Sequence, residues 1–69
     1  MFMKIVVNNN EMELPESAVL QQLLTELQLP SLQGIAVAVN QEVIPKINWN
    51  EYRLHERDAI LIIRATQGG

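Results

Sequence analysis

The sequence predicts an α+β fold in which one helix packs on a mixed sheet of about five strands. Segments with the two-residue alternation of β-strands occur near the start of the chain and again over residues 35–39. Between them, a single segment has the apolar spacing of an amphipathic helix. The 69 residues suffice for one small domain, and 48% of them are hydrophobic while none is cysteine, so apolar packing has to hold the fold.

The first predicted element is a β-hairpin. Residues 3–7 are rich in β-branched side chains, and the Asn8-Asn9-Asn10 run favours a tight turn because Asn tolerates left-handed backbone angles. Residues 11–14 fit a second strand that Pro15 interrupts, with Met12 and Leu14 facing the core. Alternation gives the first strand two faces, Met3, Ile5 and Val7 on one and Phe2, Lys4 and Val6 on the other.

An amphipathic helix is predicted next, ending near Gln28. Ser17 is the expected N-cap, with its hydroxyl accepting from a free amide of the first turn. Pro30 disfavours helical backbone at Leu29 and so ends the helix. A helix of about eleven residues is not stable alone, so its apolar stripe has to lie on a sheet. The stripe comprises Val19, Leu20, Leu23, Leu24 and Leu27.

The second half of the chain predicts three further strands. Residues 35–39 alternate between branched side chains and alanine, and Asn40-Gln41 forms a turn into a short strand over 42–44 that Pro45 stops. A brief helical turn is expected around residues 47–49. Residues 58–64 are apolar at nearly every position, which indicates a central strand.

Composition narrows the function. The formal net charge of −3 argues against nucleic acid as a partner, since a basic face would be expected. There is no secretory signal, and no apolar run approaches the ~20 residues that span a bilayer, so a cytoplasmic protein without membrane contact is expected. With no cysteine and a single histidine, His55, the chain offers no thiolate to a metal, and neither a metal site nor a nucleophile-and-base pair of its own is expected.

The sequence ends in Gly68-Gly69, which predicts a domain over residues 1–65 and a flexible tail over 66–69. Two residues without side chains make a thin tether that can enter a partner's active site where a Cβ would clash. Two interpretations compete: a frayed terminus, as is common, or a terminal carboxylate that is itself the reactive group. The glycine pair alone does not decide between them.

The order of elements is that of the β-grasp fold of ubiquitin-like proteins, and residues 38–49 narrow the match. This segment contains a turn with Asn, a short strand, a Pro followed by a basic residue, and a Trp, in the sequence Ala38-Val39-Asn40-Gln41-Glu42-Val43-Ile44-Pro45-Lys46-x-x-Trp49. The same features at the same spacing are typical of the thiamine-biosynthesis sulfur carrier family, ThiS. The chain resembles this family over its whole length. One departure is Glu56-Arg57-Asp58, where the family usually has an acidic residue, Gly and Asp. If this position needs a positive φ, Arg57 costs about 1 kcal/mol there, or else the turn changes type.

The resemblance implies a carrier protein and not an enzyme. Gly69 would be adenylated and converted to a thiocarboxylate, and Gly68, Gln67 and Thr66 would give access to it. The implied partners are an adenylyltransferase related to ubiquitin-activating enzymes, a persulfide-bearing sulfur donor and thiazole synthase. ATP would be used by the activating partner, and this chain would bind no cofactor.

Alternatives remain at this point. Within the fold, the rival is the small subunit of molybdopterin synthase, and from other classes a protein modifier or an interaction domain with an inert tail. Trp49 is either a packed core-edge residue or a binding anchor, with packing favoured, and His55 is expected to be solvated without an acid/base partner. Phe2 and Val6 form a candidate partner surface. Arg64 could guide the tail into an acidic or phosphate-bearing cleft.

Overall fold

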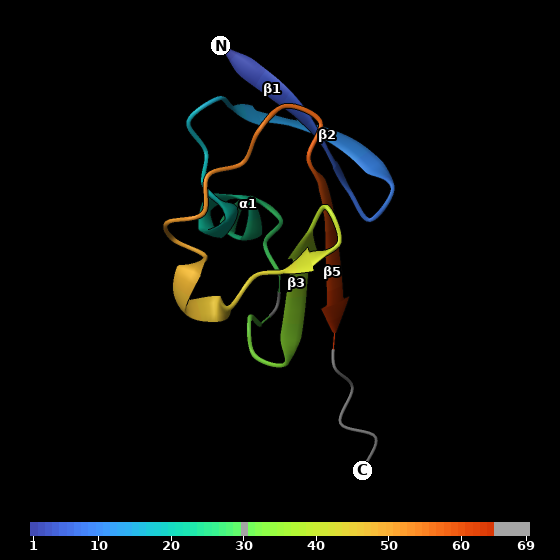
Figure 1. Ribbon diagram of the computed structural model, residues 1–69, viewed down its shortest axis with the longest axis vertical. Coiled ribbons are helices and arrows are strands. Elements are labelled where there is room, and N and C mark those ends of the chain that lie inside the picture. Colours follow the sequence, from blue (N-terminus) through green and yellow to red (C-terminus); the bar gives the residue numbers. More distant parts are fainter. Residues whose placement is uncertain (30, 65–69) are drawn as a thin grey trace.

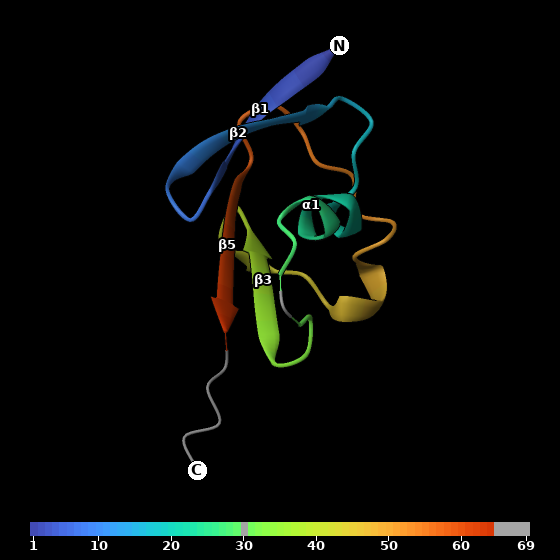
Figure 2. The same cartoon turned by 180° about the vertical axis from the view of Figure 1, so that it is seen from behind.

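The computed structural model describes residues 1–29 and 31–64 and contains one helix on a five-stranded mixed sheet. The strand order is β2-β1-β5-β3-β4, and only the β1–β5 pair is parallel. Figures 1 and 2 show α1 on one side of the sheet and the β5 arrowhead pointing away from the β1–β2 hairpin. The predicted fold class is confirmed. The elements are β1 (Phe2–Val7), β2 (Asn10–Pro15), α1 (Leu20–Glu26), β3 (Ile35–Val39), β4 (Glu42–Val43), the 3₁₀ turn η1 (Lys46–Asn48) and β5 (Ala59–Arg64).

The hairpin β1–β2 forms as its alternation predicts. Met3, Ile5 and Val7 are buried, and the turn places Asn8 and Asn9 at φ 49° and 72°. These positive angles at both central residues match the right-handed twist of the flanking strands. Asn10, predicted as part of the turn, is the first residue of β2.

Pro15 does not interrupt β2, contrary to expectation. It is the last residue of the strand and pairs with Phe2. Because β2 is an edge strand, the missing N–H of proline leaves no ladder hydrogen bond unmade.

The helix begins at Leu20, so the prediction of Ser17 as N-cap is wrong. The N-cap is Val19, whose extended backbone makes an isolated β-bridge with Arg53 and whose side chain offers no cap hydrogen bond. The first free amides of the helix donate to carbonyls that are distant in sequence, Leu20 N to Tyr52 O (2.8 Å) and Gln21 N to Trp49 O (2.9 Å). The 49–52 segment therefore caps α1.

The helix ends at Glu26, two residues short of the expected end. Gln28 has φ 54°, a left-handed conformation that closes the helix, and its amide donates to Thr25 O at 3.1 Å. The helix spans 7 residues in place of about eleven, and Leu20, Leu23 and Leu24 of the predicted stripe are buried. Its stability therefore comes from packing on the sheet.

The second half follows the predicted order with small shifts of boundary. The strand over 35–39 is confirmed as β3, and Asn40 and Gln41 form the predicted turn with φ 52° and 73°. β5 occupies the centre of the sheet, as its continuous apolar character indicates, but starts at Ala59, because the amide of Asp58 closes the preceding turn by donating to His55 O at 3.1 Å.

The core lies between α1, the inner faces of β1, β3 and β5, and the segment after β4. Trp49 is among the largest fully buried side chains, and Ile44 and Leu54 complete this wall of the core. Buried residues from all these elements form one cluster. The face of the sheet opposite α1, called the open face below, carries the remaining side chains of the inner strands.

Candidate functional site

The predicted reactive end, Gly69, lies outside the described residues, as do Gly68, Gln67, Thr66 and the predicted boundary between domain and tail. The structure therefore shows the base from which the chain continues, which is β5 up to Arg64. Through Ile62 this strand is bonded on both sides, to β1 or its turn and to β3.

Of the three residues predicted to contact a partner, two lie on the open face and one does not. Phe2 and Val6 both lie on it, and Phe2 is 68% exposed. Arg64 shares the opposite side of β5 with Ile60 and Ile62, as the strand alternation requires. Phe2 and Val6 thus lie on one face, and Arg64 on the other.

Register extends the apolar part of the open face across the sheet. Leu61 pairs with Ala38, which pairs with Val43, and Ile63 pairs with Ala36. Val43, Leu61 and Ile63 are exposed large apolar side chains. This set, Val6, Ala36, Ala38, Val43, Ala59, Leu61 and Ile63, is called the apolar patch below.

Beside the apolar patch, the open face is hollowed by a groove of mixed charge. The groove, of about 600 Å³, runs from Phe2 and Val6 over the outer side of the hairpin to the turn before β5. Its charged lining residues are Lys4, Arg57, Glu11, Glu13 and Glu56. The open face therefore offers an apolar surface next to side chains of both signs.

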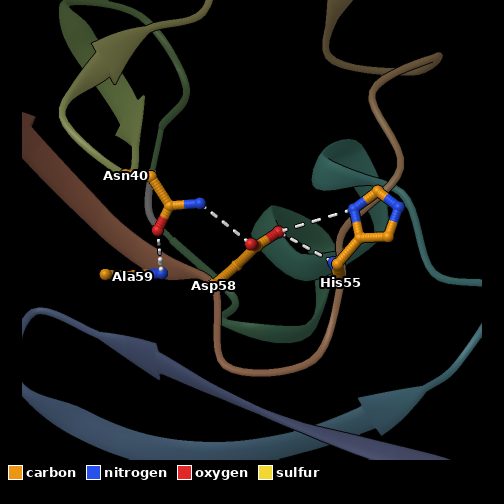
Figure 3. Close-up of polar contacts among 4 residues, drawn as sticks. All are labelled: Asn40, His55, Asp58 and Ala59. Atoms are coloured by element: carbon orange, nitrogen blue, oxygen red, sulfur yellow. Dashed lines mark hydrogen bonds and ion pairs between the residues drawn. The ribbon is translucent and has the colours of Figure 1, made fainter.

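A buried carboxylate, that of Asp58, holds the start of β5 in place, and this role was not predicted from the sequence. Asp58 is 7% exposed, and its Oδ1 accepts from Asn40 Nδ2 at 3.0 Å while its Oδ2 accepts from the amide of His55 at 2.7 Å (Figure 3). Asn40 Oδ1 in turn accepts from the amide of Ala59 at 3.0 Å. These hydrogen bonds join the β3–β4 turn, the turn over 55–58 and β5.

His55 is exposed, as predicted, with 78% of its side chain accessible. The expectation that it has no acidic partner is wrong, because its Nδ1 lies 3.9 Å from Asp58 Oδ2 (Figure 3). The spacing of three residues was visible in the sequence, but only the turn over 55–58 brings the two side chains together.

Trp49 is a packed residue and not an anchor on the surface. It is 2% exposed, and its Nε1 donates to Ile44 O at 2.9 Å. The Lys46 ammonium lies 6.0 Å from the ring centroid, at the limit of a cation–π contact. The indole therefore belongs to the core and satisfies its one polar group internally.

Two further findings concern residues 1–29 and 31–64. None of their helices has the length and apolar character needed to cross a membrane. They also contain no group of three or more His, Asp or Glu side chains placed to hold a metal ion.

One helix on a mixed five-stranded sheet, with the last strand at its centre, defines the class of ubiquitin-like β-grasp proteins. Within this class the chain belongs to the ThiS family, whose family description matches residues 3–69. The resemblance read from residues 38–49 is confirmed.

Two relatives show the extent of the similarity. The chain is 28% identical over 67 residues to the sulfur carrier protein ThiS of Escherichia coli (strain K12), covering 97% of this chain and all of that protein. It shares its fold with the crystal structure of the thiamine biosynthesis protein ThiS from Geobacter metallireducens. The TM-score is 0.84 at 23% identity, over 97% of this chain and all of the other.

Proposed function

We propose that Gly69 is the sulfur-carrying residue, adenylated at its carboxylate and then converted to a thiocarboxylate. Membership of the ThiS family makes the chain a sulfur carrier protein of thiamine biosynthesis, and the chemistry at Gly69 is what the proposal adds. The observation that supports it most directly is the family match, which extends through Gly69 in a chain without cysteine. A chain without cysteine has no thiol side chain to which the carried sulfur could be attached.

The chemistry requires activation because a carboxylate is a poor electrophile. Attack of the Gly69 carboxylate on ATP forms an acyl adenylate and releases pyrophosphate. A persulfide sulfur then attacks the carbonyl carbon and AMP leaves. A second thiol cleaves the S–S bond of the resulting acyl disulfide, which yields the thiocarboxylate and a new disulfide on the partners.

Each catalytic group in this scheme is assigned to a partner. An adenylyltransferase related to ubiquitin-activating enzymes supplies the ATP site, a persulfide-bearing protein supplies the sulfur, and thiazole synthase consumes it. This chain is the co-substrate that moves between them. The apolar patch and Phe2 supply docking surface, while Arg64 lies next to the tail on the other side of β5 and guides it.

The length of chain beyond β5 suits this division of roles. Five residues follow Arg64, and an extended chain of five residues spans at most about 17 Å. A partner that binds the open face of the domain can therefore accept the terminal carboxylate in an active site within this distance.

The test is to incubate the chain with its host's adenylyltransferase, ATP and a sulfur donor, and to measure the intact mass. A gain equal to the replacement of one oxygen by sulfur is expected, and none in a variant lacking Gly69 whose circular dichroism is unchanged. An unchanged wild-type mass with a competent activating enzyme would contradict the proposal. Thiazole synthase, and not the large subunit of molybdopterin synthase, should then consume the sulfur, and high-mass lysine adducts would indicate a modifier.

A further inference from the structure

The side chain of Asn8 takes the place of a strand next to β5. Its Oδ1 accepts from the amide of Ile62 at 2.8 Å, and its Nδ2 donates to the carbonyl of the same residue at 3.4 Å. A primary amide that both accepts from and donates to one residue's backbone reproduces the pairing that a neighbouring strand would provide. The two residues are 54 positions apart in sequence.

This contact matters because the backbone pairing between β1 and β5 is short. Its register covers Val6 with Ala59 and Val7 with Ile60, and the amide of Asn8 then donates to Ile60 O at 2.9 Å. At Asn8 the chain turns away with φ 49° to enter the hairpin. The Asn8 side chain adds the next pairing, at Ile62, after the β1 backbone has left.

Beyond Ile62, β5 is paired in register with β3 alone, through Ile63 with Ala36 and Arg64 with Ile35. Without the Asn8 amide, one-sided pairing would begin two residues earlier. A strand bonded on one side opens more readily than one bonded on both. The Asn8 side chain therefore sets how far along β5 the chain is held from two sides.

We infer that Asn8 is a positioning residue for sulfur loading, which fixes the point from which the reactive tail extends. The inference rests on the function proposed above. Residues that are not held add freedom between the docked domain and the reacting carboxyl, and this lowers the fraction of time the carboxyl spends in reach of ATP. Docking uses the open face, where Asn8 and Asn9 both line a hollow beside Val6 and Leu61, but only the Asn8 side chain bonds to Ile62. Compared with the same substitution at Asn9, loss of the contact should therefore lower kcat of adenylation and leave KM for the carrier equal.

Asn8→Gly tests this against a matched control, Asn9→Gly. Both positions have positive φ, so glycine is tolerated at each, but Asn9 makes no side-chain hydrogen bond within the described part of the chain. In Asn8→Gly the Ile62 amide should exchange with solvent at least about tenfold faster than in Asn9→Gly, measured by NMR. Pyrophosphate release with the host adenylyltransferase should show kcat lower by roughly three- to tenfold at equal KM.

Asn8→Asp is the conservative variant, since it keeps the acceptor for the Ile62 amide and tolerates the turn. It loses the donor to the Ile62 carbonyl, so its protection and kcat should lie between those of the wild type and those of Asn8→Gly. Equal kcat in Asn8→Gly and Asn9→Gly, or a rise in KM with kcat unchanged, would overturn the positioning role while adenylation of the wild type still upheld the proposed function. A wild-type chain that releases no pyrophosphate would overturn both.

Discussion

Asn40 and Asp58 hold each other across 18 residues of sequence. The Asn40 amide donates to the buried Asp58 carboxylate at 3.0 Å and accepts, on its other side, from the Ala59 amide at 3.0 Å. A buried carboxylate is stable only when hydrogen-bonded, and the left-handed backbone of Asn40 points its side chain at this one. The pair ties the β3–β4 turn to the first residue of β5, the strand that leads into the tail.

Removal of this amide should destabilise the domain. Asn40→Gly keeps the positive φ but leaves both Asp58 Oδ1 and the Ala59 amide without their partner. We expect a loss of about 2 kcal/mol in the free energy of unfolding, measured with urea. The control is Gln41→Gly, at a second positive-φ position with an exposed side chain, which should change stability by less than about 0.5 kcal/mol. Equal effects of the two would show that the amide contributes nothing.

Trp49 should stabilise the fold through both the volume of its ring and the hydrogen bond of its indole N–H. Trp49→Phe leaves a smaller ring and removes the donor to Ile44 O, so a loss of about 2 kcal/mol is expected in thermal or urea unfolding. Lys46→Ala, which removes only the exposed cation over the ring, should be nearly neutral by the same measurement. A larger effect of Lys46→Ala than of Trp49→Phe would contradict this assignment.

Arg57 has a left-handed backbone conformation, with φ 69°, so of the two alternatives left open by the sequence the structure has the positive φ. Because glycine adopts this conformation without a Cβ clash, Arg57→Gly should be more stable than Arg57→Ala by about 1 kcal/mol. The alanine variant controls for loss of the guanidinium. If the two variants unfold at the same urea concentration, the turn carries no conformational cost.

Because of Tyr52, we expect the free energy of unfolding to fall at alkaline pH. Burial, with smaller contributions from the carboxylates of Asp58 and Glu42, raises the pKa of Tyr52 above its usual 10.0. The folded chain therefore holds the phenolic proton more tightly than the unfolded one. The resulting stability is present below pH 10.0 and is lost as the pH rises through the folded pKa. Between pH 9 and 11, urea unfolding should show a larger loss for the wild type than for Tyr52→Phe, and equal losses would refute this.

The sequence predicts most of the fold because local patterns carry it. Alternation identifies β1 and β3, positive-φ asparagines mark both hairpin turns, and continuous apolar character places β5 at the centre. The errors occur where distant segments override local preference. Ser17 has the composition of an N-cap, yet carbonyls from the 49–52 segment satisfy the first amides of α1.

The candidate site also has features that the sequence predicts and contacts that only the structure reveals. The ThiS resemblance could be recognised because contiguous motifs carry it, whereas the predicted role of the glycine tail stays a prediction, since residues 66–69 lie outside the described part of the chain. The side-chain contacts of Asn8, Asn40 and Asp58 could not be predicted from the sequence, because their partners lie 54 or 18 residues away and only the sheet brings them together. Asn8 and Asn40 read locally as turn residues, and their side-chain contacts with β5 and Asp58 had to come from the structure.

The central claim, that Gly69 carries the sulfur, is tested most directly by locating the added mass. After reaction with the adenylyltransferase, ATP and the sulfur donor, the intact chain is fragmented in the mass spectrometer. We expect the replacement of oxygen by sulfur in fragments that contain Gly69 and in none that end at Gly68 or earlier. Because the unreacted chain already holds sulfur in its three methionines, the readout is this mass change. The same mass change on any fragment without Gly69 would contradict the claim.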